Sequence, residues 1–335
     1  MRHIYCLILC FCPMLVGAQT WEDRSVFGAS NPARTLRVLS STDTSFFAPI
    51  IESFLQRQPG LAVEYFVIGT AQIDEIFRAE PSEYDVVISS AMDLQLKLVN
   101  DGYGLPIANL GVPDWAQWRD SLYAFTSEPA TVVVNRSAFP NGDVPRSRQE
   151  LIQALRARPE LFDGRVGTYD VRLSGLGYLF ATQDARASES FWRLMEVMGG
   201  LNAKLYCCSG EMIEDLETGK LLVAYNVLGS YVDARETVSD QLEVILPSDF
   251  PTTMMRTAFV HVGTTLRGDA EAFVRHLVNL QSALLSPETF PLPRLTSNTD
   301  ASGQSAITLE PALMTYLDPL KRRTFIKEWS DAIIQ

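Results

Sequence analysis

The feature of this sequence that most constrains its fold is a strand-then-helix order that recurs through residues 35–104. The segments TLRVLSS, LAVEYFV and YDVVISS have the composition of β-strands. Each is followed by a segment with apolar residues at helical spacing. The clearest is STDTSFFAPIIESFLQRQPG, in which Phe46, Phe47, Ile50, Ile51 and Phe54 recur on one face. This order predicts an open, largely parallel α/β sheet.

Small polar residues stand where these strands end. They are Ser41, Thr42, Thr70, Ser89 and Ser90. Ligands of open α/β sheets bind at the carboxyl ends of the strands. The helix N-termini that follow present unpaired N–H groups and partial positive charge. Several such helix starts at one edge predict a binding site for an anion. The alternative is that each hydroxyl only caps its own helix.

The same pattern returns in the second half of the chain, where ATVVVNRSAF, GRVGTYDV and LLVAYNVLGSY have strand character. The loop RLSGLGYLFATQ turns into a helix through Arg172, Ser174 and Gly175, and glycine lets a backbone approach a ligand closely. The loop is neither a P-loop nor a G-x-G-x-x-G motif, so it gives little support for a nucleotide. The Pro-rich residues 245–255 are typical of an extended crossover, and the polar residues 19–34 predict a loose arm.

The N-terminus has the features of a secretory signal peptide. Arg2 and His3 precede an apolar run from Ile4 to Val16, and small residues follow it. The run is shorter than the ~20 apolar residues of a membrane-spanning helix. We expect residues 1–18 to be removed after Ala18 and the mature chain to be periplasmic. The alternative is an uncleaved N-terminal helix buried in the fold.

Composition and motifs limit the possible functions. The 335 residues allow two domains, and 47% apolar and 20% charged residues are typical of a globular chain. A formal net charge of −12 argues against a nucleic-acid partner. The sequence contains no G-x-S-x-G or H-E-x-x-H motif, and beyond the signal peptide its histidines are His261 and His276. We therefore expect neither enzymatic activity nor a cofactor.

The order of these segments resembles one family. TLRVLSS, EYDVVISSAMD, ATVVVNRSAF, TYDVRLSGLGYLFA, CSGEMIEDLETGKLLVAYN, RTAFVHVG and SPETF are similar to segments of bacterial periplasmic solute-binding proteins of the type II fold. The similarity is to the branch of ABC transporter proteins that binds ferric iron, phosphosugars or phosphoglycerate. It implies an α/β fold with two lobes that close on a ligand by hinge bending. Residues 35–127 and 253–335 would form lobe 1, and residues 128–248 would form lobe 2.

The resemblance also implies a ligand site and partners. The wall on lobe 1 would contain Ser41, Thr42, Thr70, Ser89 and Ser90. The facing wall would contain Arg172, Ser174, Gly175, Ser209, Tyr225 and Asn226. The protein would act as a monomer that presents its solute to an inner-membrane ABC permease or to a membrane sensor histidine kinase.

Two of these residues have structural alternatives. Arg172 would be a planar, bidentate donor to a carboxylate or phosphate, or else would pair with Asp170 at the surface. Tyr225 could stack on a ligand or could be a buried tyrosine whose hydroxyl is already satisfied.

The residues favour an organic anion over a metal. Iron-binding members of the family carry adjacent tyrosines after the strand that matches LLVAYN, whereas residues 227–230 here are Val, Leu, Gly and Ser. Two histidines supply a hard ferric site poorly. We expect a small phosphorylated or carboxylated solute, with a receptor for ferric iron or another metal as the alternative.

Cys207 and Cys208 are adjacent in the segment KLYCCSGEM. Cys6, Cys10 and Cys12 leave with the signal peptide, so the intramolecular disulfide open to the mature chain is the one between neighbours. Three roles remain open for the pair: small polarisable side chains that line the cleft, a vicinal disulfide that stiffens the loop, or a soft-metal site.

Overall fold

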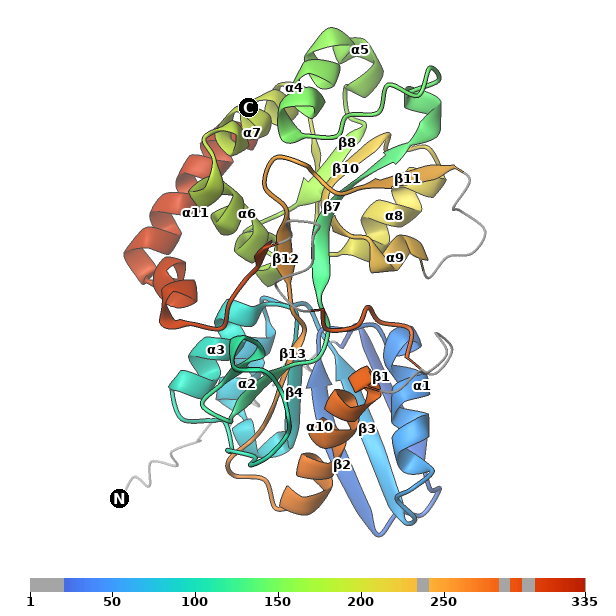
Figure 1. The fold of residues 1–335 in the computed structure, drawn as a ribbon, viewed down its shortest axis with the longest axis vertical. Coiled ribbons are helices and arrows are strands. Elements are labelled where there is room, and N and C mark those ends of the chain that lie inside the picture. Colours follow the sequence, from blue (N-terminus) through green and yellow to red (C-terminus); the bar gives the residue numbers. More distant parts are fainter. Residues whose placement is uncertain (1–20, 234–240, 283–289, 297–304, 335) are drawn as a thin grey trace, which may run out of the picture.

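The computed structural model describes residues 21–233, 241–282, 290–296 and 305–334, which form two α/β lobes stacked along the long axis of the molecule (Figure 1). Each lobe is built on its own seven-stranded sheet. This is the two-lobed α/β architecture that the sequence predicted. None of the helices in the described parts of the chain combines the length and the apolar character needed to cross a membrane.

The sheet of the first lobe has a parallel centre. Its strand order is β1-β3-β2-β4-β13-β6-β5, and β2 runs parallel to both β3 and β4. Its strands are β1 (Asp23–Gly28), β2 (Arg34–Ser40), β3 (Leu61–Val67), β4 (Val86–Ser89), β5 (Gln117–Trp118), β6 (Leu122–Ala124) and β13 (Thr257–Val260). The helices of this lobe are α1 (Thr44–Leu55), α2 (Ile73–Ala79), η1 (Pro81–Glu83), α3 (Met92–Asn100), η2 (Asp114–Ala116) and α10 (Arg267–Ser282).

The sheet of the second lobe has the order β14-β12-β7-β10-β8-β9, with β11 also paired to β7. Its strands are β7 (Glu128–Asn135), β8 (Val166–Tyr169), β9 (Lys204–Tyr206), β10 (Val223–Leu228), β11 (Leu242–Ile245), β12 (Thr252–Met254) and β14 (Ser305–Ala306). The helices of this lobe are η3 (Arg136–Ala138), α4 (Arg148–Ala157), α5 (Pro159–Phe162), α6 (Gly175–Ala187), α7 (Ser190–Gly200), α8 (Ser209–Glu217), α9 (Ser230–Asp233), η4 (Pro311–Leu317) and α11 (Pro319–Ile333).

The N-terminal segment differs from the loose arm that its composition suggested. Residues 23–28 form β1, an edge strand that pairs antiparallel with β3 over its whole length. Phe27 packs against the core while Val26 stays 66% exposed, which is the alternation of a half-buried strand. A six-residue strand rich in polar side chains gives a weak signal in the sequence, and its pairing with β3 is what stabilises it.

The C-terminal segment also differs from the expected division, in which residues 253–335 would complete lobe 1. Helix α10 packs against α1 and β13 of the first lobe, whereas α11 packs against α7 of the second. Phe325, Trp329 and Ile333 on α11 belong to the apolar core of the second lobe. Helix α11 therefore belongs to the second lobe, because its apolar face packs against α7 of that lobe.

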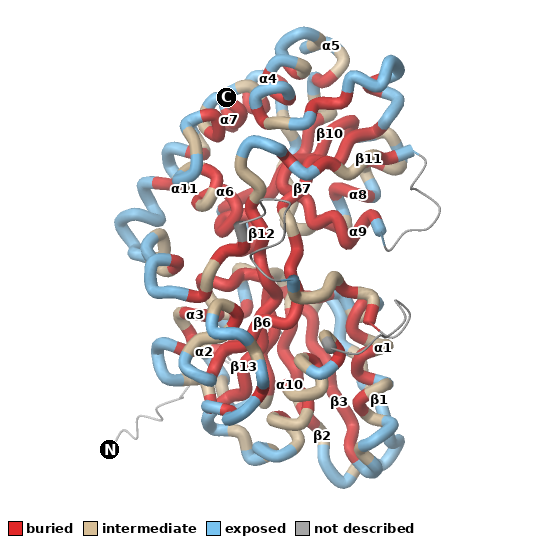
Figure 2. Tube along the Cα trace, in the orientation of Figure 1, coloured by how far each residue is buried: buried red, intermediate tan, exposed pale blue. Residues whose placement is uncertain are grey.

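Two neighbouring strands carry the chain between the lobes. Met254 pairs with Glu128 on the side of the second lobe, and Thr257 pairs with Ala124 on the side of the first. Between these pairs the N–H of Phe125 donates to the carbonyl of Arg256 at 3.0 Å. The hinge is thus a hydrogen-bonded ribbon, and Figure 2 shows it as part of the buried interior.

Candidate ligand-binding cleft

A cavity of about 40 Å³ lies between the two lobes. Space of this size holds a few water molecules or a small polar group. The first lobe and the hinge contribute Glu22, Ser41, Asp43, Ile68, Gly69, Thr70, Ser90 and Arg256 to the lining. The second lobe contributes Tyr169, Ser174, Leu176, Cys207, Cys208, Ser209, Leu228 and Tyr231. The lining includes five residues predicted from the sequence: Ser41, Thr70, Ser90, Ser174 and Ser209.

The serines that follow β2 and β4 form one polar cluster. The Ser41 hydroxyl donates to the Ser89 hydroxyl at 3.3 Å, and the Ser90 N–H donates to the Ser41 hydroxyl at 3.4 Å. Ser89 also accepts the N–H of Ala91, just before α3, at 3.1 Å, and it does not line the cavity. Ser90 is 2% exposed and lines the cavity, and no described residue hydrogen-bonds to its hydroxyl. Ser90 is therefore the hydroxyl of this cluster that remains open to a ligand.

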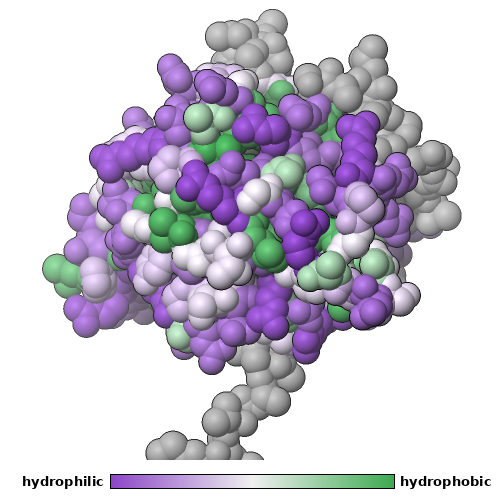
Figure 3. Space-filling model, turned by 90° about the horizontal axis from the view of Figure 1, so that it is seen from below, coloured by the Kyte–Doolittle hydropathy of each residue, from purple (hydrophilic) through white to green (hydrophobic). Residues whose placement is uncertain are grey.

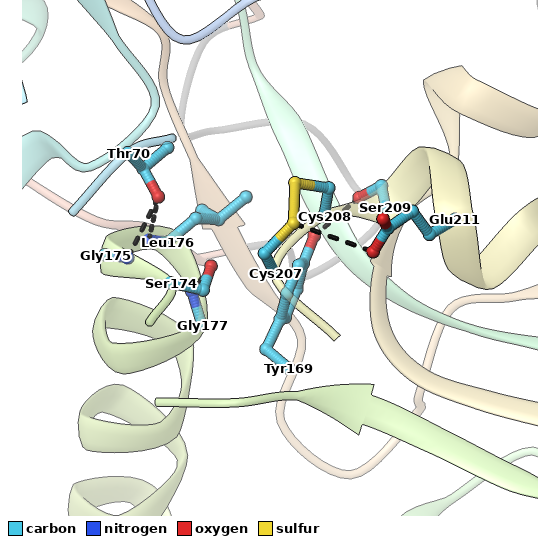
Figure 4. The surroundings of a disulfide bond; sticks show 10 residues. All are labelled: Thr70, Tyr169, Ser174, Gly175, Leu176, Gly177, Cys207, Cys208, Ser209 and Glu211. Carbon is cyan, nitrogen blue, oxygen red and sulfur yellow. Dashed lines mark hydrogen bonds between the residues drawn. A yellow bond between two sulfur atoms is a disulfide. The ribbon is translucent and has the colours of Figure 1, made fainter. Parts of the chain in front are cut away.

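Thr70 joins the two lobes directly. Its hydroxyl oxygen accepts the N–H of Gly175 at 2.9 Å and the N–H of Leu176 at 3.2 Å (Figure 4). These N–H groups belong to the N-terminus of α6, where Ser174 caps the N–H of Gly177 at 3.1 Å. The helix start that was expected to bind an anion is thus occupied by a hydroxyl from the facing lobe. The contact holds the cleft closed.

The wall on the second lobe is made where β8 and β9 meet α8. The hydroxyls of Tyr169 and Ser209 share a hydrogen bond of 2.5 Å, and Ser209 also accepts the N–H of Leu228 at 3.3 Å. Cys207 and Cys208 are joined in a disulfide between neighbours and line the cavity beside them (Figure 4). The cysteines thus line the cleft and form a vicinal disulfide, which are two of the three roles considered for them.

Arg256 is a cleft residue that the sequence analysis missed. It is 1% exposed, and its Nε and Nη2 donate to the two carboxylate oxygens of Glu128 at 2.6 and 3.1 Å. Its Nη1 donates to the Thr42 hydroxyl at 2.6 Å, which places Thr42 in support of Arg256 and not in the cavity lining. The available signal was a cation directly after a Pro-rich crossover in the sequence.

Tyr231 was not predicted either, because the adjacent tyrosines of the iron-binding family members were expected directly after Asn226. It lies in α9, and its ring packs on Phe46 of α1 at a centroid distance of 4.9 Å, across the cleft. Tyr231 is 9% exposed and lines the cavity, and its hydroxyl makes no hydrogen bond with a described residue. Burial raises the pKa of this phenol, and the nearby Arg256 acts in the opposite direction.

Arg172 does not face the cavity. Its Nε and Nη2 donate to the two oxygens of Asp170 at 2.8 and 2.6 Å, and its side chain is 43% exposed. This is the surface pair that was the alternative to a ligand role. Asp170 is only two residues from Arg172, so its carboxylate reaches both N–H groups of the guanidinium more easily than a ligand in the cleft would.

Tyr225 and Asn226 also lie outside the cavity lining, in a polar network inside the second lobe. Tyr225 accepts a hydrogen bond from Nε of the fully buried Arg148 at 2.6 Å and donates to Asp184 at 2.6 Å. Asn226 donates to the same carboxylate at 2.9 Å. The network ties β10 to α4 and α6, so these polar groups are satisfied within the fold. Gly175, the remaining predicted residue, contacts Thr70 and does not line the cavity.

Two carboxylates complete the polar lining. Glu22 and Asp43 lie on the side of the first lobe. Burial raises the pKa of Glu22, and Asp43 and Glu211 add to this effect. The cavity therefore offers hydroxyl donors, one guanidinium and carboxylate acceptors. Among the described residues, no group of three or more His, Cys, Asp or Glu side chains is placed to hold a metal ion.

Two α/β lobes, a two-stranded hinge and a polar cavity between them define a class of proteins that bind a small ligand by closing on it. No protein-family model and no curated protein sequence matches the chain. Solved structures do. The substrate-binding protein of an ABC transporter from Agrobacterium tumefaciens is 29% identical, with a TM-score of 0.86, over 93% of this chain and 98% of that one.

Two more distant structures show the same fold. AfuA from Actinobacillus pleuropneumoniae, a periplasmic binding protein solved with fructose-6-phosphate, is 17% identical with a TM-score of 0.67, over 90% of this chain and 99% of that one. Iron-bound HitA from Pseudomonas aeruginosa is 14% identical with a TM-score of 0.66, over 89% of this chain and 99% of that one.

The chain has the fold of the type II periplasmic substrate-binding proteins of ABC transporters, in agreement with the resemblance that its sequence showed. The comparisons indicate a substrate-binding protein of an ABC transporter. The similar structures are binding proteins, which is consistent with the absence of enzymatic motifs in the sequence.

Proposed function

We propose that this protein is a periplasmic receptor that captures a small organic anion, phosphorylated or carboxylated, in the cleft and presents it to an ABC permease. The observation that carries the proposal is Arg256. A guanidinium has five N–H donors, and three of those of Arg256 are engaged by Glu128 and Thr42. The remaining donors belong to a buried cation that lines the cavity.

The other lining groups complement an anion that also carries hydroxyls. The hydroxyls of Ser90 and Tyr231 are further donors for its charged end. Glu22 and Asp43 are acceptors for hydroxyl groups of the solute, and Glu128 already balances the charge of Arg256. A phosphorylated or hydroxylated acid of a few carbon atoms matches this distribution.

Binding tests the proposal. Mass spectrometry of the native mature protein identifies any co-purified solute, and calorimetric titration with phosphosugars, phosphoglycerates and di- or tricarboxylates measures affinity. We expect 1:1 binding of one of these classes. Ser90→Ala should weaken it by about tenfold or more, because it removes a hydrogen bond to a charged ligand. Arg172→Gln, at a predicted residue outside the cavity, is the matched control and should leave the affinity unchanged.

A ferric-iron receptor is the second candidate, because two phenols and two carboxylates line the cavity. The Tyr169 hydroxyl is engaged by Ser209, and burial raises the pKa of both phenols, which opposes the phenolate form. Stoichiometric binding of Fe(III), with no heat from any organic anion, would replace the first proposal by this one.

Export and the receiving partner are part of the same proposal. Residues 1–18 lie outside the described part of the chain, and N-terminal sequencing of the periplasmic protein should find Gln19 first. A neighbouring gene for a permease supports delivery for transport, whereas a neighbouring histidine kinase gene supports sensing.

A further inference from the structure

A second, larger hollow lies on the second lobe, outside the interlobe cleft. This groove has a volume of about 590 Å³ and is formed by α6, α7, η4 and α11. Its lining consists of Ala185, Arg186, Trp192, Thr315, Tyr316, Leu320, Lys321, Thr324, Phe325 and Glu328. No predicted site residue is among them, so the solute-binding function leaves this groove unexplained.

Aromatic rings meet in the groove. Phe325 lies 5.5 Å from Trp192 and 5.7 Å from Tyr316, measured between ring centroids. Leu320 beside them is 65% exposed. By contrast, the end face of the first lobe shows apolar residues only in small, scattered groups (Figure 3). The groove thus offers a concave apolar seat for one large side chain of a partner.

The rim of the groove is cationic. Arg186 and Lys321 line it, and Arg322 and Arg323 follow in α11. Within the described residues, the ion pair of α11 joins Lys327 to Asp331, and no ion pair includes Arg186, Lys321 or Arg323. Helix α11 begins at Pro319, so Lys321, Arg322 and Arg323 lie at its positive end, where the helix dipole disfavours them. The chain as a whole has a net charge of −12, so a local group of cations stands out. Because these cations do not stabilise the helix, we infer that they serve to bind an anionic partner.

The groove is connected to the interlobe boundary. Helix α6 begins at the Thr70 contact in the cleft and ends at Ala185 and Arg186 in the groove. Helix η4 contacts α3 of the first lobe on one side and α11 on the other. The Tyr178 hydroxyl of α6 donates to the carbonyl of Tyr316 at 2.6 Å. A partner in the groove would therefore contact elements whose positions depend on whether the lobes are closed.

We propose that the groove is the docking site for an acidic segment of the membrane protein that receives the closed form. Its carboxylates pair with Arg186 and Lys321, and one aromatic or branched apolar side chain packs against Trp192 and Leu320. Glu328 in the lining disfavours a uniformly anionic surface such as a lipid bilayer. The expectation of a membrane partner rests on the proposed function, whereas the charge and shape of the groove do not.

Photocrosslinking in the native host tests the docking site. A photoreactive amino acid is placed at Thr324, which is exposed in the groove, and as a control at Thr218, which is exposed at the end of α8. We expect an adduct from Thr324 alone, which peptide mass spectrometry maps to an acidic segment of an inner-membrane protein. Lys321→Glu should reduce it about fivefold or more, and Lys204→Glu, at an exposed lysine on β9, should not.

Any of these results would overturn the proposal: equal adducts from Thr324 and Thr218, no adduct from Thr324, an adduct to a neutral or basic segment, or an adduct to phospholipid. The lipid outcome has an independent check, because the purified protein should then bind phosphatidylglycerol vesicles, not phosphatidylcholine vesicles, and lose this binding in Lys321→Glu. Solute titration of Lys321→Glu separates the two proposals. Unchanged solute affinity with a lost adduct supports the groove, whereas solute binding with no adduct in any variant refutes the groove alone.

Discussion

At Gly175 the backbones of the two lobes approach each other closely. A Cβ atom there would lie 3.1 Å from the carbonyl oxygen of Thr70 and 3.2 Å from the Cβ of Ala91, both on the first lobe. Each distance is shorter than an ordinary van der Waals contact, so the lobes would have to separate by a few tenths of an ångström. The hydrogen bonds from Thr70 to the start of α6 would lengthen with them.

Gly175→Ala should therefore weaken solute binding about tenfold, which corresponds to roughly 1.4 kcal/mol. Thermal stability should not fall, because alanine favours the helix over glycine by up to about 1 kcal/mol. Titration and thermal unfolding of the variant measure the two effects. Gly210→Ala is the control, since its nearest neighbours would be ring atoms of Tyr231 at 3.8 and 3.9 Å. Equal affinities of the two variants would contradict a closing role for Gly175.

Arg256 and Glu128 form a fully buried ion pair at the hinge, with exposed fractions of 1% for both side chains. Arg256→Leu should reduce the free energy of unfolding by about 3–5 kcal/mol, because it leaves Glu128 as an uncompensated buried charge. Arg256→Leu combined with Glu128→Leu should recover most of this loss and still fail to bind the anion. Urea unfolding and titration check both parts. A double variant that binds like the wild type would show that Arg256 does not contact the solute.

The disulfide between Cys207 and Cys208 has a direct chemical test. The unreduced mature protein should weigh two hydrogen masses less than the protein treated with a reductant. Cys207→Ser, which leaves a single thiol, should show no such difference. Equal masses before and after reduction of the wild type would mean that the pair is present as two thiols.

The positions of the serines at strand ends and helix starts could be predicted from the sequence, whereas the partners of the arginines could not, for a physical reason. Ser41, Ser90, Thr70 and Ser209 stand at strand ends or helix starts, and local pattern locates both. The roles of Arg172 and Arg256 depend on which carboxylate each guanidinium reaches. Asp170 is two residues from Arg172, whereas Glu128 is far from Arg256 in the sequence and becomes its neighbour only because β7 pairs with β12.

At the scale of single elements, α11 is the clearest case of long-range packing. Trp329 is 1% exposed in the core of the second lobe, and Gly199 of α7 lets the backbone of Ile333 approach. A Cβ at Gly199 would lie 2.4 Å from the carbonyl oxygen of Ala332. The sequence of α11 has the amphipathic pattern of a helix, but this pattern does not show which lobe covers its apolar face.

Trp329→Ala should reduce the free energy of unfolding by about 3–5 kcal/mol, because it opens a large cavity between α7 and α11. Chemical denaturation measures the loss. Trp192→Ala, at a partly buried tryptophan in the groove, is the matched control. It should reduce the free energy of unfolding clearly less than Trp329→Ala, since the Trp192 ring is not fully enclosed. A similar cost for the two would show that α11 contributes little to the core.

Helix α3 carries a buried carboxyl at its start. Burial raises the pKa of Asp93 to about 7, although backbone N–H groups and Arg322 act in the opposite direction. One oxygen of this carboxyl has no hydrogen-bond partner among the described residues. In the unfolded chain the pKa of an aspartate is about 3.9. Between these values the folded protein holds a proton that the unfolded chain has released.

The free energy of unfolding should therefore fall as the pH rises from about 4 to about 7. Asp93→Asn removes the titrating group, so its stability should gain on that of the wild type by a few kcal/mol across this window. Urea unfolding at a series of pH values checks the slope. Parallel curves for the two proteins would mean that Asp93 is already ionised in the folded state.

At the scale of the whole molecule, the α/β fold was predictable because the strand and helix pattern is local and repeated, whereas the division into two lobes came from the resemblance to a known family. The strand order was not, since β13 enters the first sheet from a distant part of the sequence and β1 adds an edge with a weak pattern. The contacts between the two walls of the cleft could not be predicted from the sequence either. They join residues of different lobes, Phe46 to Tyr231 and Thr70 to Gly175, and they form only when the lobes come together.

The hinge ribbon has a mechanical consequence. A hydrogen-bonded pair of antiparallel strands can bend across its plane, whereas sliding one strand along the other breaks its ladder. The ribbon therefore favours bending between the lobes over sliding of one strand along the other. Removing a single residue from residues 125–128 or 254–257 would turn every later side chain of that strand to the opposite face. Glu128 and Arg256 would then point apart, so the length of the ribbon is constrained as tightly as the side chains of the cleft.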